Sequence, residues 1–588
     1  MFPGLFSYIK LKITLESFMK YRKRLLSIFL SLLLFLTGCG NLSIPTNANT
    51  AFRNFTLNLF RQEVASNTIN LHYSLQEPEK YGIIDAPITF GSMDVGETTA
   101  RASIENVASA LRKFSYNTLS AENQLTYDIL VYYLEHAKKD LDYYFYAEPL
   151  SPVTGIHAQL PVLLAEYQFH NSEDVKTYLA LLETMPDYFD SIVRFEKQKA
   201  ADGLFMCDAL ADEVIAQCNA FIEMGENNYL LSTFEERVEK LQGISSEDTA
   251  RYRKQNKTLL TSAILPSYEN LASELAKLKG KNTELQGLCH FPKGKEYYTH
   301  LAASETGSNK TIHELKVLIQ SQLAQDILDM QSIVNAHPDI LKQTATITES
   351  PDTILKNLEG KITNAFPAAA AVNVEVKYVP SALEAFLSPA FYLIPSIDNY
   401  NENVIYINQA YSMDDIHLFT TLAHEGYPGH LYQTTYYANT NPDPIRTMLN
   451  FTGYVEGWAT YAEMCSYYIS SLEKPHATIL QKNNSIILGL YAYADIGIHY
   501  DGWTMEDTIA FFSSYGITDE TAIREIYELI VGDPANYIAY HVGYLEILEL
   551  KKEMMTQKGN AFSQKEFHQK LLKIGPAPFE IVEKYMMK

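Results

Sequence analysis

Apolar residues recur at helical spacing through most of the first half of the chain. Four long runs show this period, and proline and glycine lie mostly between them. From about Phe52 to Leu278 the pattern therefore predicts a helical scaffold. The four runs are Tyr127 to Leu141, Val175 to Met185, Asp208 to Met224 and Thr261 to Leu278.

The period changes to an alternation of apolar and polar residues at Val372 to Tyr378, which predicts a half-buried strand. Val404 to Asn408 predicts a second strand. The segment between them, Ser388 to Asn403, contains Pro and Asn and predicts a loop that overhangs a neighbouring cleft. We expect the strands to form a small sheet, whose edge strand is suited to bind an extended peptide through main-chain hydrogen bonds.

The helix predicted directly after the sheet carries the candidate chemistry. Ser412 and Asp415 have the spacing of a capping box, and apolar residues recur near helical period from Ile416 to Tyr427. This helix presents His424 and Glu425 near its last turn. From His424 the chain reads HEGYPGH, which supplies two imidazoles and a carboxylate, the residue types of a one-zinc hydrolase site.

The spacing of the two histidines requires a break in the helix. In the common zinc-protease motif the histidines are four residues apart and share one helix face. His424 and His430 are six residues apart, so a regular helix places them about 120° from each other and cannot direct both at one metal. Pro428 cannot continue the helix, and Gly429 tolerates unusual backbone angles, so we predict that the chain turns His430 back towards His424.

A second predicted helix supplies two further acids. It runs from Tyr454 to Glu463, and the seven-residue spacing of Glu456 and Glu463 places both on nearly the same face. Two aligned acids among Trp458 and Tyr461 favour a cation site, although an exposed face with two solvated acids explains the same spacing. We predict that Glu456 is the third zinc ligand and that Glu463 orients one of the ligands.

Several of these segments resemble one known family. HEGYPGH and YVEGWATYAE are similar to the HE-x-x-PGH and EGWALY-type motifs of the bacterial family catalogued as domain of unknown function 885, which is grouped with zincin-like metallopeptidases. The resemblance extends over nearly the full chain. Further similar segments are Gly294 to Tyr298, Ile312-His313, Asp495 to His499, Gly502 to Thr504 and Pro534 to Gly543.

The resemblance implies a mainly α fold, with a large helical zincin-like body and a small β-sheet next to the metal-site helix. It also implies one bound zinc ion. The chain departs from the family pattern at four positions that bear on substrate contacts and leave the metal ligands intact. Ala535 replaces a Gly, His541 replaces a Lys, Leu431 stands where many members have a second His, and Tyr491 stands where an Arg is expected.

The chemistry of the three ligands predicts a hydrolytic mechanism. His424, His430 and Glu456 leave a fourth coordination position for water, whose pKa zinc lowers towards neutrality. We expect Glu425 to act as general base on this water and to pass the proton to the leaving amine.

The matched motifs suggest the remaining roles. Tyr540 and His499 are candidate donors to the tetrahedral oxyanion. A core tyrosine and a hydrogen bond from His499 to Asp495 explain the same two positions without catalysis. Asp495 is expected, like Glu463, to contact a zinc ligand without touching the metal and so to orient that ligand. His541, beside Tyr540, is a candidate for binding a substrate carboxylate.

Composition and charge indicate one large domain and argue against nucleic-acid binding. With 588 residues, 47% of them apolar, the chain can bury a large core, and no repeat or long linker divides it. We therefore expect one domain from 51 to 588, with a scaffold half at 51–290 and a catalytic half at 291–588. The net charge of -23 argues against nucleic-acid binding, because phosphate binding needs a clustered basic surface.

The N-terminus has the pattern of a bacterial lipoprotein signal. Arg22 to Arg24 precede an apolar run that ends in Leu-Thr-Gly-Cys at Cys39, and this run is too short for an ordinary membrane span. We predict a signal peptide at 1–39, lipidation of Cys39, a tether at 40–50 and an extracytoplasmic body anchored to the cell membrane. Met19 fits the start of a signal better than Met1, which makes 1–18 an upstream extension. An uncleaved anchor helix is the alternative.

The other four cysteines are Cys207, Cys218, Cys289 and Cys465. Their even number in an exported protein is compatible with up to two disulfides in three connectivities, and equally with four buried thiols.

Together these features predict zinc-dependent hydrolysis of peptide bonds in short peptides at the outer face of the cytoplasmic membrane. A helical body closing around the metal favours flexible, short substrates. Two alternatives remain open. One is a catalytically idle surface lipoprotein that binds a solute or partner, and the other is a metal-dependent amidase or esterase acting on non-peptide substrates.

Overall fold

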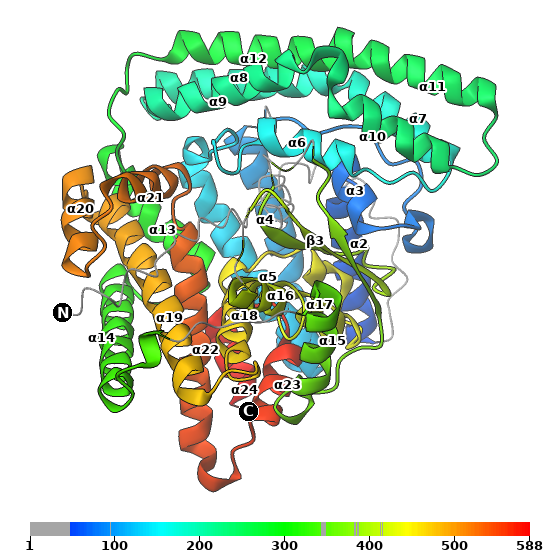
Figure 1. Cartoon of the computed structure of the whole chain (residues 1–588). Helices are drawn as coiled ribbons and strands as arrows, with labels where there is room; N and C mark the ends of the chain where they lie inside the picture. The colour runs from blue at the N-terminus through cyan, green and yellow to red at the C-terminus, as the bar shows by residue number, and fades with distance from the viewer. Residues whose placement is uncertain are drawn as a thin grey trace.

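Helices of the N-terminal half form an upper layer over the rest of the molecule (Figure 1). The structure is a computed structural model and describes residues 47–93, 96–342, 349–381, 384, 387–411, 413 and 415–587. Residues at helical spacing hold this layer together: Tyr268, Leu271 and Leu275 are all buried. Its helices are α7 (Ser172–Glu183), α8 (Met185–Ala201), α9 (Asp208–Glu223), α10 (Tyr229–Lys240), α11 (Ser246–Leu259) and α12 (Leu265–Leu278).

The lower body contains the C-terminal half and the first helices of the chain (Figure 1). Its main supports are α2 (Ala48–Val64), α4 (Glu97–Leu111), α5 (Ala121–Asp140), α13 (Gly294–Thr306), α14 (Ile312–Ala336), α16 (Asp415–Glu425), α17 (His430–Ala438), α18 (Thr452–Ser466), α19 (Lys474–Ile496) and α22 (Asn536–Lys558). The mainly α fold predicted from the sequence is confirmed, and the four predicted runs are helical in α5, α7, α9 and α12. The last of them starts with a π-helical turn, Leu260–Ile264, that continues α11.

Three strands form one small sheet in the order β1-β3-β2. β1 (Asn373–Tyr378) pairs in parallel with β3 (Glu402–Ile407), and these are the two strands predicted from the sequence. β2 (Ala390–Leu393) pairs antiparallel with β3. The loop predicted for Ser388 to Asn403 therefore contains a strand, which forms an edge of the sheet.

The sheet lies between two hydrophobic cores. On one face Tyr392 and Ile405 belong to the core of the lower body, together with Phe419 of α16. On the other face Phe391 and Tyr406 stack with ring centroids 5.0 Å apart and belong to the core that contains the upper layer. Because neighbouring strand residues point to opposite faces, the sheet connects the two layers and fixes α16 beneath it.

α18 and α22 approach each other unusually closely. A Cβ on Gly543 would lie 2.0 Å from the carbonyl oxygen of Gly453, and a Cβ on Gly457 would lie 2.4 Å from the carbonyl carbon of Gly543. Glycine is required at this crossing, since any side chain would separate the two backbones. The crossing fixes the N-terminal half of α22 against the helix that carries Glu456.

The N-terminal predictions fall largely outside the described residues, which begin at 47. The signal peptide, Cys39 and most of the tether belong to that part. The helix α2 begins at Ala48, inside the segment predicted as a tether. Among the described residues, no helix combines the length and apolar character needed to cross a membrane. Ser412 of the predicted capping box is likewise outside the described residues.

The four cysteines of the described chain are free thiols. Of the two alternatives left open by the sequence, the structure therefore shows the one without disulfides. Cys207 and Cys218 are buried in the core of the upper layer, and Cys289 and Cys465 are partly buried.

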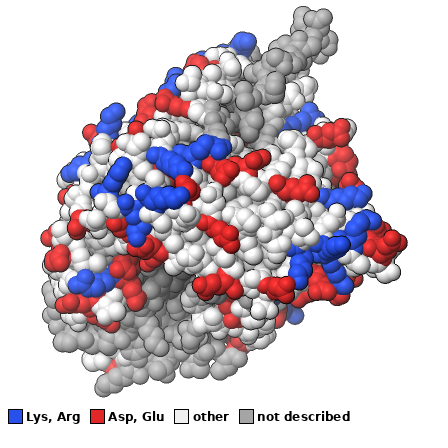
Figure 2. Space-filling model, turned by 90° about the horizontal axis from the view of Figure 1, so that it is seen from above, with Lys and Arg blue, Asp and Glu red and all other residues white. Residues whose placement is uncertain are grey.

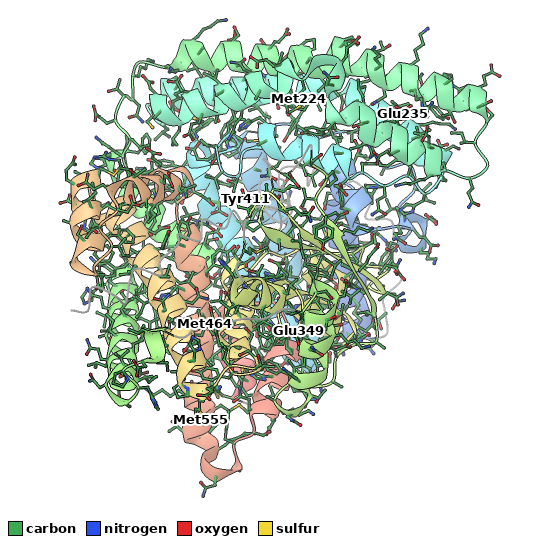
Figure 3. The ribbon with its side chains drawn as sticks, viewed as in Figure 1. Met224, Glu235, Glu349, Tyr411, Met464 and Met555 are labelled. Carbon is green, nitrogen blue, oxygen red and sulfur yellow. The ribbon has the colours of Figure 1, made fainter. Side chains whose placement is uncertain are left out.

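Charged side chains of both signs are interspersed on the face of the upper layer (Figure 2). On this face the acidic side chains are therefore mixed with basic ones. Met224 and Glu235 mark the upper layer in Figure 3, and Met464 and Met555 mark the lower body.

Candidate metal centre

The three predicted zinc ligands lie together. One ligand atom from each of His424, His430 and Glu456 lies within 4.8 Å of the others. Glu456 Oε2 is 3.3 Å from His430 Nε2 and 3.8 Å from His424 Nε2. The two imidazole rings are 4.8 Å apart between centroids and nearly perpendicular, at 76°.

The separations of Glu456 from the two histidines are close to those of a tetrahedral metal site. Zinc bonds of about 2.0–2.1 Å at tetrahedral angles place neighbouring ligand atoms about 3.3–3.4 Å apart. The distances from Glu456 to the two imidazoles, 3.3 and 3.8 Å, lie at or just above this value. Two imidazole nitrogens and one carboxylate oxygen are also the donor types that zinc prefers, and three protein ligands leave one position open.

The histidines meet because the helix stops between them. α16 ends at Glu425, and α17 begins at His430. The carbonyl of Pro428 accepts a hydrogen bond of 2.9 Å from the indole Nε1–H of Trp458, which ties the turn to α18. The predicted break at Pro428 and Gly429 is therefore present.

Gly429 has the unusual backbone angles expected from the sequence, with φ -81° and a ψ of -131° that lies outside the main α and β regions. The structure adds a second reason for glycine. A Cβ at this position would lie 1.7 Å from the carbonyl oxygen of His424. The Gly429 N–H donates to the Ala423 carbonyl at 2.9 Å, so the turn is folded back tightly onto the end of α16. Glycine is needed for close approach.

Glu463 lies behind the ligands, in contact with His424. His424 Nδ1 is 3.1 Å from Glu463 Oε2, and Asn484 Nδ2 donates to the other oxygen, Oε1, at 2.9 Å. Since a carboxylate only accepts, this contact keeps the proton on Nδ1 and leaves Nε2 as the ligand atom. Asn484 lies on α19, and no pattern in the sequence distinguished it.

Glu425, the predicted general base, is held by the edge strand of the sheet. Its Oε2 accepts a hydrogen bond of 2.8 Å from the main-chain N–H of Tyr392 in β2. The strand missed in the sequence analysis thus orients the residue next to the ligand His424. The edge strand thus lies next to the metal centre, but Ala390, Phe391 and Tyr392 are buried and the Tyr392 N–H is already bonded, so substrate binding along this edge stays a prediction.

The acids of this centre are deeply buried. Glu425, Glu456 and Glu463 are each no more than 4% exposed. Burying carboxylates costs free energy unless a cation or several hydrogen bonds compensate them. The hypothesis that Glu456 and Glu463 are solvated on an exposed face is therefore wrong, and the concentration of negative charge favours a bound cation.

His499 is occupied within the fold. Its Nε2 lies 2.8 Å from the carbonyl oxygen of Ile530, and its Nδ1 accepts from the Leu288 N–H at 3.1 Å. Burial lowers its pKa to about 4, so the imidazole is neutral. With both nitrogens engaged by main chain, His499 has no donor for a substrate oxyanion, and its bonds differ from the predicted pair with Asp495.

Asp495 instead connects two other family-like segments. Its Oδ1 accepts from the Tyr298 hydroxyl at 2.6 Å and from the Ala535 N–H at 3.1 Å. Ala535 has a φ of 61°, in the left-handed region that favours glycine, which explains why Gly is expected there. These two contacts of Asp495 fix the start of α22, while a direct contact with the predicted zinc ligands stays a prediction.

His541 lies in the interior between α22 and α19. It is fully buried, and a Cβ on Gly489 of α19 would lie 3.1 Å from its ring. Burial lowers its pKa to about 3, so the side chain is uncharged. A neutral imidazole without solvent access is unsuited to bind a substrate carboxylate, and that prediction is not supported.

Tyr540 stays a candidate for the oxyanion. It is 7% exposed and lies one helical turn before Gly543, the residue of α22 that contacts α18 beside Glu456. Tyr540 thus lies near α18, the helix that carries Glu456, and its role as a hydrogen-bond donor to the oxyanion remains a prediction.

The chain is similar to known proteins in sequence and in fold. Residues 93–586 match the family described as "Bacterial protein of unknown function (DUF885)". The fold is similar to the crystal structure of the "putative lipoprotein" from Colwellia psychrerythraea, with a TM-score of 0.78 and 19% identity over 92% of this chain and 99% of that chain. A "putative lipoprotein of unknown function" from Shewanella oneidensis matches with a TM-score of 0.61 and 16% identity over the same shares. No curated protein sequence matches significantly.

Proposed function

Because the chain belongs to the bacterial family DUF885, whose description names no activity, we propose from its metal centre that the protein hydrolyses peptide bonds with the help of one zinc ion. The observation that carries the proposal is the convergence of His424, His430 and Glu456 within 4.8 Å, with Glu425 next to them. Three protein ligands are typical of catalytic zinc, whereas structural sites use four.

The residues around the centre have distinct tasks. When bound here, zinc supplies Lewis acidity and lowers the pKa of a coordinated water towards neutrality. Glu425, fixed by the Tyr392 N–H, accepts a proton from the attacking water and delivers it to the leaving amine. Glu463 keeps His424 in the tautomer whose Nε2 faces Glu456. Tyr540 is the proposed donor to the oxyanion.

Short peptides are the proposed substrates. The ligands and Tyr392 of the edge strand are all buried, so a folded protein has no direct access to them, whereas a short flexible chain is small enough to be enclosed there. We further propose that the protein acts outside the cytoplasm, anchored by a lipid on Cys39. The Leu-x-Gly-Cys segment of the sequence supports this placement, and the two structures similar in fold are described as lipoproteins.

Metal content and hydrolysis measured on one preparation test the proposal. Purified protein is expected to hold one zinc per chain and to cleave members of a mixed peptide pool. Glu425→Gln should keep the metal and lose about 10²–10⁴-fold in rate, since it removes only the general base. Glu473→Gln, at an exposed acid that starts α19, is the matched control and should retain full activity.

The two alternatives give different results in the same assays. An idle binding lipoprotein would hold metal or a solute without cleaving any peptide. A non-peptide amidase or esterase would cleave model amides or esters in a Glu425-dependent manner and leave the peptides intact. Full activity of Glu425→Gln on every substrate would contradict the mechanism.

A further inference from the structure

A tyrosine-rich cavity reaches the N-terminal end of α18, the helix that carries Glu456. Its volume is about 280 Å³, and it is lined from α4, α5, α13 and the turn that precedes α18. Thr452 of the lining is four residues before Glu456, so both project from one face of α18, about 6 Å apart along the helix axis. The cavity therefore contacts α18 one helical turn before a proposed zinc ligand, although none of the three proposed ligands is among its described lining residues.

Aromatic rings dominate the lining. Six tyrosines contribute to it, and three of them form a connected group in which Tyr297 contacts both Tyr143 and Tyr146. The ring centroids of these two pairs are 5.4 and 4.7 Å apart. Such faces carry negative electrostatic potential and attract cations.

The charged residues of the lining are acidic. Asp140, Glu148 and Glu305 line the cavity, whereas no Lys or Arg is among its described lining residues. Lys199 is buried and does not line the cavity, and its Nζ lies 2.8 Å from Glu148 Oε2. Nε2 of His300 lies 2.6 Å from Asp140 Oδ1. The cavity therefore presents carboxylates and aromatic faces to whatever it binds.

Two uncharged polar side chains of the lining, His136 and Asn450, each offer an acceptor as well. His136 Nδ1 bonds the Tyr132 carbonyl at 3.0 Å, and because a carbonyl only accepts, Nδ1 carries the proton. Burial lowers the pKa of His136, which leaves Nε2 with a lone pair. The amide of Asn450 donates to Thr452 Oγ1 at 3.1 Å, while its buried Oδ1 accepts no hydrogen bond from the described residues. The matching ligand is a donor of hydrogen bonds.

We propose that this cavity binds the ammonium group of a substrate, either the α-amino group of a short peptide or an amine-bearing side chain. An ammonium offers three donors and a positive charge, which fit the acceptors, the carboxylates and the tyrosine faces. A substrate carboxylate in the same cavity would be repelled by the acidic residues of the lining. That the bound molecule is a substrate rests on the function proposed above.

Matched peptides test the proposal by calorimetric binding to the zinc-loaded Glu425→Gln protein, in which turnover is suppressed. The peptides are tetra-alanine with a free amino terminus, the same peptide N-acetylated, and an N-acetylated peptide with one lysine. The free-amine peptide should bind at least about tenfold more tightly than the acetylated one. If lysine restores the affinity, a side-chain amine is also accepted; if not, the site selects the α-amino group. Equal affinity for all three, or no binding of any, would overturn the proposal.

Substitutions in the cavity lining test whether the preference for a free amine arises in this cavity. Tyr297→Leu should weaken binding of the free-amine peptide about fivefold while Tyr297→Phe, which keeps the ring, should not. Glu305→Gln should weaken it to a similar degree. Glu135→Gln, at an exposed acid of α5 outside the lining, is the control. Wild-type affinity in both Tyr297→Leu and Glu305→Gln would contradict the assignment.

The two proposals fail separately. If the wild-type protein cleaves free and acetylated peptides equally well, the hydrolase function stands and the ammonium site falls. If binding prefers the free amine and no peptide is cleaved, the ammonium site stands and the hydrolase function falls.

Discussion

Replacing Glu463 tests whether hydrogen bonds behind the ligands hold the metal centre in place. The carboxylate of Glu463 accepts from His424 Nδ1 at 3.1 Å and from Asn484 Nδ2 at 2.9 Å, and it is 4% exposed. In Glu463→Gln both contacts can persist, because Asn484 can rotate its amide and present an oxygen. What is lost is the negative charge. A hydrogen bond to a charged acceptor is worth about 1 kcal/mol more than one to a neutral acceptor, so zinc affinity should fall roughly fivefold to tenfold.

Removing the side chain has a larger effect. Glu463→Ala leaves the buried Nδ1–H of His424 without this acceptor and frees the ring to turn, which should weaken zinc binding about 100-fold. Competition with a chromophoric chelator measures both variants, and Glu473→Gln serves as the control. The expected order is wild type, then Gln, then Ala. Wild-type zinc affinity in Glu463→Ala would refute the reasoning that Glu463 orients His424.

Three further predictions concern the backbone and the buried histidines. Gly429→Ala should cost at least about 3 kcal/mol of folding stability, or about 100-fold in zinc affinity if the fold is kept, because the added Cβ lies 1.7 Å from the His424 carbonyl oxygen. Gly360→Ala, where nothing lies within 4 Å, is the control, and equal behaviour of the two variants in thermal unfolding and chelator competition would contradict this account. Ala535→Gly should raise the free energy of unfolding by up to about 1 kcal/mol, because it relieves a left-handed φ of 61°; a loss of stability in denaturant titrations would argue against strain. His541→Leu should flatten the acid dependence of stability. Burial lowers the folded pKa of His541 to about 3, so below about pH 6.5 the unfolded chain gains a proton that the folded chain does not, and stability is lost as the pH falls. Denaturant titrations from pH 6 to 4 should show the wild type losing about 1.4 kcal/mol more per pH unit than the variant, and parallel curves would disprove the assignment.

The helices were predictable because their signal is local. In α12 the residues Tyr268, Leu271 and Leu275 recur on one face, and this spacing is visible without knowing the helix's partner. The strand β2 was missed because it is four residues long and follows Pro389 in a segment rich in turn residues. Its extended form depends on pairing with β3, a contact that its own sequence does not encode.

The candidate site likewise contains residues whose role the sequence predicts and residues whose role depends on distant parts of the chain. The convergence of His424, His430 and Glu456 was predictable because metal sites use few residue types and the spacing of these residues limits the geometry. The role of His499 depends on main-chain groups of Leu288 and Ile530, which are distant in sequence. A histidine in a family-like motif therefore looked catalytic until its surroundings were known.

Anomalous scattering at the zinc absorption edge, measured on crystals of the purified protein, tests the central claim most directly. The account predicts one strong peak per chain, about 2.0–2.1 Å from His424 Nε2, His430 Nε2 and a carboxylate oxygen of Glu456. Crystals grown with zinc that show no peak among these three side chains, or a peak held by other residues, would contradict it.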